Sequence, residues 1–438
     1  MKVLKFGGSS LASAATIKEA ASLIQNQKEN KNIIVLSAFE GMTNALVEIA
    51  ECLYKKNSAG AEEIIDCLDI KFSKLISELF TTGEYKCLAE ESLKKHFSII
   101  RSFTKDLFTM FEEKAILAQG ELFTSSILVL LLKEQQVKVV LIPALDFMRT
   151  DKNSEPDPFY IKERLHKQLD KHPDVDVYIT QGYICRNAFG EIDNLERGGS
   201  DFSASLIGAA VDAEEIQIWT DSAEMQNNDP HCVEHTFPIR HLHFEEAAEL
   251  AYFGAGILHP SRILPADLNM IPVRLLNILH PDSPGTLISN RPEKGKIKAV
   301  AAKDGITAIK IKSGRMLLAY GFLRKVFEIF ENYRTAIDMV VTSEVGVSVT
   351  IDQTTHLTEI LNDLKKYGTV SVDQNMTIIC VVGDLDWDNL GFESKAVQAL
   401  KDLRVRMISY GGSNNNISFL IQTEDRQRAL QALSNNLF

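Results

Sequence analysis

Short apolar segments alternate with helical segments through the first half of the chain. Five stretches read as strands because they are short and apolar: residues 2–6, 33–38, 137–142, 175–180 and 216–219. Helical patterns separate most of them, and the longest helical region covers residues 45–135. Strands joined through helices pair in parallel, because a parallel neighbour needs a long crossover connection. The alternation predicts an α/β fold with an open, mainly parallel sheet sandwiched by helices.

Glycine or polar residues follow several of these strands, and the carboxyl ends of parallel strands meet at one edge, where ligands bind. Lys5 lies in the first strand, and Gly7 and Gly8 follow that strand before a helix. This order suits phosphate binding, although in a Walker loop the lysine follows the glycines. The alternative is an edge-strand lysine before a tight turn.

A glycine-containing loop at residues 194–199 leads into a second candidate helix. Gly198 and Gly199 let backbone N–H groups approach a ligand, and the free amides of a first helical turn attract anions. Arg197 can clamp a carboxylate, while Asp201 can orient a lysine or hold Mg²⁺. The alternative is a capped helix with a surface salt bridge.

Composition excludes several classes of protein. The 438 residues are enough for two or three domains, and a net charge of -12 argues against a nucleic-acid surface. Six cysteines without a CxxC pair are typical of a reducing compartment, and the apolar run at 127–132 is too short to span a membrane. The histidines and Cys232 between residues 231 and 243 do not have a zinc-site spacing, so no metal site is predicted. With no signal-peptide pattern, we expect a cytoplasmic protein without a membrane partner.

A proline-, glycine- and charge-rich stretch at residues 281–298 marks a domain boundary, so the first domain is predicted to cover 1–290. The remaining residues contain the order β-α-β-β-α twice, which predicts two ferredoxin-like α+β domains at 298–370 and 371–438. The last segment of the chain is expected to pack against the first of these domains. Neither repeat contains a plausible nucleophile and base, so a binding or regulatory role is favoured.

Five short motifs that occur in order along the chain together carry a resemblance to a known family. They are Lys5-Phe6-Gly7-Gly8-Ser9-Ser10, Arg197-Gly198-Gly199-Ser200-Asp201, Trp219-Thr220-Asp221, Phe253-Gly254-Ala255 with Leu258-His259-Pro260, and Ile271-Pro272-Val273-Arg274. Over essentially its whole length the sequence therefore resembles the aspartokinases of the amino acid kinase superfamily, with paired C-terminal ACT domains. Thr342-Ser343-Glu344-Val345 and residues 405–411 are most similar to the lysine-sensitive, monofunctional type.

The resemblance implies transfer of the γ-phosphoryl group of ATP, with Mg²⁺, to the side chain of L-aspartate. The product would be 4-phospho-L-aspartate, at the first step of lysine, threonine and methionine (diaminopimelate) biosynthesis. The acceptor carboxylate is ionised at neutral pH and needs no general base. Catalysis must then come from positioning and from positive charge.

Site residues follow from the same resemblance. The catalytic pair is Lys5 and Asp201. The residues implied to hold aspartate are Ser37, Thr43, Glu121, Tyr183, Arg197 and Ser200. Those implied to contact the nucleotide are Lys5, Gly7, Gly8, Ser9, Thr220, Asp221, Gln226, Asp229 and His231.

Three departures from the family pattern fall on the nucleotide side. Gln226 stands where the family has a tyrosine, His231 where it has an arginine, and Gly256 where it has a lysine. Each lost charge-assisted bond is worth roughly 1.5–3 kcal/mol, so weaker ATP binding is expected unless another cation substitutes. Two alternatives stay open: a non-catalytic amino acid sensor on the same fold, and a sister amino acid kinase.

The resemblance also implies a lysine site between the first ACT domains of two subunits, in a homodimer or a dimer of dimers. Its residues would be Met316, Gly321, Phe322, Leu323, Ile337, Asp338, Thr342, Ser343 and Glu344. Asp338 and Glu344 could meet the two ammonium groups of L-lysine. Ala319 and Ala336 replace serines of that type, and Met316, Phe322 and Leu323 would alternatively serve as core packing.

Overall fold

The computed structural model describes residues 1–27, 31–105, 107–195, 199–221, 224–253, 260–313, 320–386 and 388–438. It divides into two compact units. The first contains Met1–Glu224 and His259–Asn290, and the second contains Met225–Leu258 and Arg291–Phe438.

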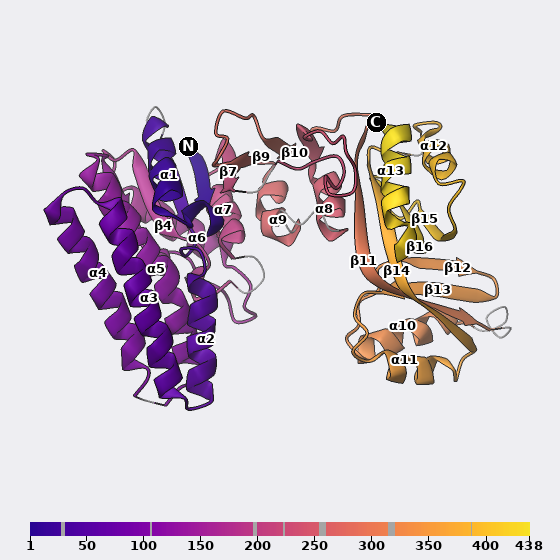
Figure 1. The fold of residues 1–438 in the computed structure, drawn as a ribbon, viewed down its shortest axis with the longest axis horizontal. Helices are drawn as coiled ribbons and strands as arrows, with labels where there is room; N and C mark the ends of the chain where they lie inside the picture. Colours follow the sequence, from indigo (N-terminus) through magenta and orange to yellow (C-terminus); the bar gives the residue numbers. More distant parts are fainter. Residues whose placement is uncertain are drawn as a thin grey trace. The chain divides into compact units, whose positions relative to one another are not determined.

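The first unit has the predicted α/β order (Figure 1). Its strands are β1 (Lys2–Phe6), β2 (Asn32–Leu36), β3 (Val139–Leu141), β4 (Val177–Gln181), β5 (Ile184–Arg186), β6 (Ile192–Asn194), β7 (Glu215–Thr220), β9 (Val273–Asn277) and β10 (Thr286–Ser289). Its helices are α1 (Ala14–Asn26), α2 (Met42–Tyr54), α3 (Ser58–Leu79), α4 (Gly83–Ser102), α5 (Met110–Glu134), α6 (Pro158–Leu169), α7 (Gly199–Ala210) and α9 (Pro260–Leu268).

The main sheet of this unit runs in the order β3-β4-β2-β1-β7-β9-β10. All neighbours from β3 to β9 are parallel, and only β10 runs antiparallel to its neighbour β9. The prediction of an open, mainly parallel sheet is confirmed. Phe6 is paired with Leu36 on one side and Trp219 on the other, so β1, β2 and β7 end side by side. The polar residues after these strands are therefore neighbours.

Helices α2 to α5 lie side by side in Figure 1 and form the largest helical layer of the unit. Rings of Phe39, Phe72, Phe97 and Phe123 pack edge to face or tilted in their core. Among the described residues α5 is the one helix long and apolar enough to cross a membrane, yet 78% of its most apolar window is buried in the unit. Glu121 lies near the middle of this helix.

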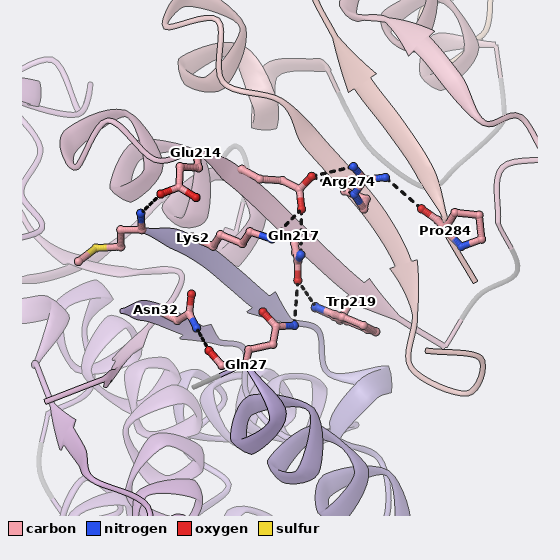
Figure 2. Close-up of polar contacts among 10 residues, drawn as sticks. Lys2, Gln27, Asn32, Glu214, Gln217, Trp219, Arg274 and Pro284 are labelled. Atoms are coloured by element: carbon pink, nitrogen blue, oxygen red, sulfur yellow. Dashed lines mark hydrogen bonds and ion pairs between the residues drawn. The ribbon is translucent and has the colours of Figure 1, made fainter. Parts of the chain in front are cut away.

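A polar network covers one face of β7 (Figure 2). Arg274 on β9 binds Glu215 at 2.9 Å, and Gln217 accepts a hydrogen bond from the Trp219 indole at 3.2 Å. Gln27, just after α1, also donates to Gln217. Glu215, Gln217 and Trp219 occupy every second position of the strand, so their side chains lie on the same face of the sheet.

On β1, Lys2 pairs with Glu215 and the Phe6 ring stacks on Trp219, so both point to that same face. Lys5 is out of phase with them and points to the other face, toward α7. The network therefore locks the register of β1 on β7 while leaving the Lys5 side for ligands.

The second unit consists of an antiparallel sheet with helices at its two ends (Figure 1). Its helices are α8 (Phe244–Tyr252), α10 (Phe322–Asn332), α11 (Leu357–Leu364), α12 (Phe392–Ala399) and α13 (Arg426–Leu437). Its strands are β8 (His241–His243), β11 (Ile297–Lys312), β12 (Val340–Ser343), β13 (Gly346–Ile351), β14 (Thr369–Gly383), β15 (Val405–Tyr410) and β16 (Asn416–Gln422). Six of them form one sheet in the order β12-β13-β11-β14-β16-β15.

The two predicted repeats share their long strands. The second half of β11 packs with α10 and α11, while its first half, with Val300, packs with α12 and α13. The 16-residue β11 and 15-residue β14 pair along most of their length and belong to both cores. The sheet is therefore continuous across the boundary expected near residue 370.

The first domain differs from the continuous 1–290 that the sequence suggests. Residues 225–258 lie with the C-terminal unit, although the chain returns to the first unit until Asn290. The carbonyl of Asn227 accepts a hydrogen bond from the Val300 N–H at 2.8 Å, and Val233 packs in the core around α13. Apolar contacts and strand pairing, which depend on no local sequence signal, place this segment.

Candidate active site

Lys5 and Asp201 form an ion pair at the carboxyl edge of the main sheet. The Lys5 Nζ lies 2.7 Å from Asp201 Oδ1, and the two side chains are 12% and 9% exposed. Lys5 is the fourth residue of β1, and Asp201 is the third of α7, whose first-turn amides favour anions. The structure thus brings together the two residues that the resemblance names as catalytic.

The glycine turn after β1 leaves its backbone uncovered by side chains next to the Lys5–Asp201 pair. A Cβ on Gly7 would lie 3.2 Å from Lys5 Nζ, and one on Gly8 would lie 3.2 Å from the Ala38 carbonyl. Ser9 begins the short 3₁₀ turn Ser9–Leu11. Small residues are therefore required where a phosphate would approach the ammonium group.

The ends of β2 and β4 meet the start of α7. The Ser37 and Ser200 hydroxyls are 2.9 Å apart, and the Ser203 hydroxyl accepts a hydrogen bond from the Tyr183 N–H at 2.8 Å. A Cβ on Gly182 would lie only 2.4 Å from that of Ser200, so glycine is needed for this close approach. Tyr183 has a φ of 63°, an uncommon conformation for tyrosine that turns the chain at the strand end.

Glu121 is a buried carboxyl behind this edge. It is 3% exposed, its Oε1 accepts from the Ala38 N–H at 3.3 Å, and its Oε2 meets no hydrogen-bond partner in the part of the chain described. Burial raises the pKa of Glu121 to about 8, against weak lowering by backbone hydrogen bonds. Such a group is suited to an incoming cation.

Three further predicted residues are placed as follows. Thr43 is the second residue of α2, which follows Gly41 in a left-handed conformation. Thr220 ends β7, and its hydroxyl lies 3.4 Å from the Asp221 carboxylate. Arg197 lies outside the described residues, as do Gly256, Met316 and Ala319.

The other nucleotide candidates lie in the second unit. Gln226 bridges to Pro238. The Asp229 carboxylate accepts from the His231 N–H at 2.9 Å and pairs with Arg426 on α13 at 2.7 Å. Partial burial raises the pKa of Asp229, but these hydrogen bonds outweigh it and lower the pKa overall. The carboxylate thus shapes the turn around it.

The predicted effector residues lie on and around α10 and β12. The side chain of Asp338 is 1% exposed, accepts a hydrogen bond from the Tyr252 hydroxyl at 2.8 Å and pairs with Lys303 at 2.8 Å. Lys303 also pairs with Asp352 at 3.0 Å. An internal lysine therefore already neutralises the carboxylate expected to meet an effector's ammonium group.

The remaining effector candidates are more ordinary in their surroundings. Gly321 precedes α10 with a φ of 81°, Phe322 is buried in the core beside that helix, and Leu323 packs against the same core. Ile337 also packs against it, Thr342 and Ser343 end β12, and Glu344 follows in the turn. The core-packing alternative fits Phe322 and Leu323.

Reasoning from sequence missed several charged residues of these clusters. Arg262 on α9 lies 3.4 Å from Asp201, and Lys303 and Arg426 pair with predicted residues in the second unit. No spacing rule links them to their partners, which lie 35 to 197 residues away. Only the position of Arg262, shortly after the His259-Pro260 motif, could have drawn attention to it.

Comparisons with known proteins agree with this architecture. The amino acid kinase family model matches residues 1–277, and an ACT domain model matches residues 379–437. Lysine-sensitive aspartokinase 3 of Escherichia coli is 31% identical over 448 residues, which cover 100% of this chain and 99% of the relative. Chloroplastic aspartokinase 1 of Arabidopsis thaliana is 34% identical over 459 residues, covering 100% of this chain and 80% of that protein.

Solved structures are similar along the whole chain. The E. coli aspartokinase III complex with aspartate and ADP superposes with a TM-score of 0.80 at 30% identity, covering 100% of both chains. The aspartate kinase of Clostridium acetobutylicum has the same fold, with a TM-score of 0.88, 24% identity and 100% coverage of both chains. By sequence and by fold, this chain belongs to the aspartokinases of the amino acid kinase family.

Proposed function

We propose that this chain transfers the γ-phosphoryl group of ATP to the side-chain carboxylate of L-aspartate, giving 4-phospho-L-aspartate and ADP. The observation that carries the proposal is the Lys5–Asp201 pair at the carboxyl edge of the sheet. Its support from relatives is the similar E. coli enzyme, whose structure contains aspartate and ADP.

The reaction brings two anions together, so the residues must supply positive charge and alignment. Lys5 would bind a phosphate oxygen beside the open backbone of Gly7 and Gly8. Asp201 would hold the Lys5 ammonium group in place before substrate arrives, because the pair is only 2.7 Å apart. No proton has to be removed from the ionised acceptor.

Mg²⁺ would accompany ATP and neutralise part of its phosphate charge. The donor set at this edge fits a hard cation, because Asp221 adds a carboxylate at the end of β7, next to Thr220. The chain's own part is to align the phosphates against Lys5.

Aspartate would be held by a second group of residues at this edge of the sheet. The ammonium group of aspartate is the natural partner of Glu121, whose Oε2 lacks a partner among the described residues. Ser37 and Ser200 would offer hydroxyl groups to a carboxylate, with Arg197 and Tyr183 completing the site. Binding of the ammonium group would favour ionisation of Glu121 and release its proton.

Hydroxylamine traps acyl phosphates, so hydroxamate formation from Mg-ATP and L-aspartate tests the proposal directly. We expect turnover in the parent protein, and a loss of at least about 100-fold in kcat for Lys5→Ala, because a cation at the reacting phosphate disappears. Lys55→Ala is the matched control, since Lys55 is an exposed residue paired with Glu51. Normal turnover in Lys5→Ala would refute the role of Lys5.

The sensor alternative predicts a different result. A protein that binds aspartate but neither binds ADP in a calorimetric titration nor forms hydroxamate would be a sensor on this fold. Gln226, His231 and Gly256 motivate it, because they replace residues that contact nucleotide in the family.

We propose L-lysine as the feedback effector and a homodimer through the first ACT domains as the assembly. The support is the lysine-sensitive E. coli relative, which has a structure with lysine and aspartate bound, and the exposed Glu344 carboxylate in the turn after β12. Hydroxamate assays with L-lysine and, in parallel, L-threonine identify the effector, and ultracentrifugation gives the assembly. Inhibition by threonine alone would exclude the lysine proposal.

A further inference from the structure

Two cations, from different elements, converge on the catalytic carboxylate. The Nζ of Lys5, on β1, lies 2.7 Å from Asp201 Oδ1. The Nη1 of Arg262, on α9, lies 3.4 Å from Asp201 Oδ2. One carboxylate thus lies between two positive side chains at the carboxyl edge of the sheet. The cluster carries a net charge of about +1, which suits an anionic ligand better than a closed one-to-one ion pair does.

The two cations differ in how they are held. The Lys5 side chain is 12% exposed, while the Arg262 side chain is 42% exposed. The Arg262 Nε is buried and finds no acceptor among the residues that the structure describes. The contact of Arg262 with Asp201 is long for a charge-assisted hydrogen bond, which is usually 2.7–2.9 Å. Arg262 is therefore anchored loosely and keeps donor capacity for another anion.

The position of Arg262 can compensate for positive charges that are missing from the nucleotide-binding motifs. Gly256 and His231 stand where relatives are expected to have a lysine and an arginine. Phosphoryl transfer between anions depends on cations placed around the moving group, and arginine suits this task because it stays charged and presents several donors to phosphate oxygens.

We propose that Arg262 supplies the second positive charge on the transferred phosphoryl group, opposite Lys5, with Asp201 holding both cations before substrate binds. The inference rests on the proposed function. In the step, a bond forms between an aspartate carboxylate oxygen and the γ-phosphorus. The bond from that phosphorus to the bridging oxygen breaks, its electron pair leaves with ADP, and no proton moves. Arg262 would bind equatorial oxygens as charge shifts during this exchange.

Kinetics of Arg262→Ala, Arg262→Lys and the control Lys162→Ala test the inference. Lys162 is an exposed residue on α6, paired with Asp212, in the same unit. For Arg262→Ala we expect kcat/KM for ATP to fall about 10- to 100-fold, the equivalent of one lost charge-assisted contact, with an unchanged KM for aspartate. Arg262→Lys should retain part of the activity, and added guanidinium at a non-denaturing concentration should partly restore Arg262→Ala.

Rescue separates a chemical role from a structural one. If Arg262 only held α9 against α7, Arg262→Ala would lower the melting temperature, raise the KM of both substrates and not respond to guanidinium. That pattern, or unchanged kinetics, would overturn the inference.

A binding measurement decides the inference independently of turnover. Calorimetric titration with Mg²⁺ and a non-hydrolysable ATP analogue should show weaker binding to Arg262→Ala than to the parent protein, while Lys162→Ala binds normally. Equal binding by Arg262→Ala and the parent would overturn the inference. Absence of hydroxamate formation in the parent would instead refute the proposed function, and the titration would still decide whether Arg262 contacts the triphosphate.

Discussion

At the scale of single residues, Glu121 has the clearest pH signature. Its pKa is raised to about 8 by burial, so between about pH 4.5 and 8 the folded state holds a proton that the unfolded state releases. Stability of the ligand-free protein should fall as pH rises through this window, and the loss should be complete above pH 8. Glu121→Gln removes the titration. We expect it to melt higher than the parent at pH 8 and close to it at pH 5 in thermal scans.

The same substitution should abolish the stabilisation that L-aspartate confers, because a neutral amide cannot pair with the ammonium group. Superimposable pH profiles for the parent and Glu121→Gln would contradict the assignment of the raised pKa to this carboxyl.

At the scale of elements, the Lys5–Asp201 pair depends on how closely α7 approaches the end of β4. A Cβ on Gly182 would come within 2.8 Å of the Ser200 Cα, which is backbone and cannot rotate away. Gly182→Ala should therefore displace α7 and its Asp201. We expect a loss of about 1–3 kcal/mol in unfolding free energy from urea titration, together with a loss of hydroxamate formation.

Gly83→Ala is the matched control, because Gly83 begins α4 and a Cβ there meets nothing within 4 Å. Gly83→Ala should unfold at the same urea concentration as the parent or at a slightly higher one, because alanine favours the helical conformation. Equal stability and activity in Gly182→Ala and Gly83→Ala would show that the helix tolerates the added methyl group.

At the scale of the whole molecule, the chain passes from the first unit to the second and back before it ends in the second. Residues 225–258 depend on the C-terminal half: Asp229 pairs with Arg426, Asn228 donates to the Leu430 carbonyl at 3.2 Å, and Val233 is buried near α13. A fragment ending at residue 290 lacks these partners. We expect limited proteolysis with mass spectrometry to find rapid cleavage of that fragment within 225–258, and no hydroxamate formation.

The 438-residue chain treated in the same way should be protected over that segment. An active, protease-resistant fragment would mean that residues 1–290 fold without the regulatory half.

Much of the fold was predictable from local pattern. The strand at residues 2–6 matches β1, and the helix–strand alternation correctly predicted a parallel sheet. These features follow from hydrophobic period and turn residues, which act over a few residues of chain. The helical region expected at 45–135 was not divided into its separate helices; the start of α5 at Met110, for example, is marked by a capping box at Thr109.

By itself, the sequence determined the order of strands along the chain, the residues that follow them and the family to which the chain belongs. Propensity, periodicity and motif order each depend on short stretches of sequence. Only the tertiary structure decided which charges meet. Asp201 lies between Lys5 and Arg262, Asp338 is neutralised by Lys303, and residues 225–258 join the C-terminal unit. Sheet register and core packing bring such pairs together across long stretches of chain. The sequence spacing of two residues does not predict this distance, because the side chains become neighbours only in the folded core.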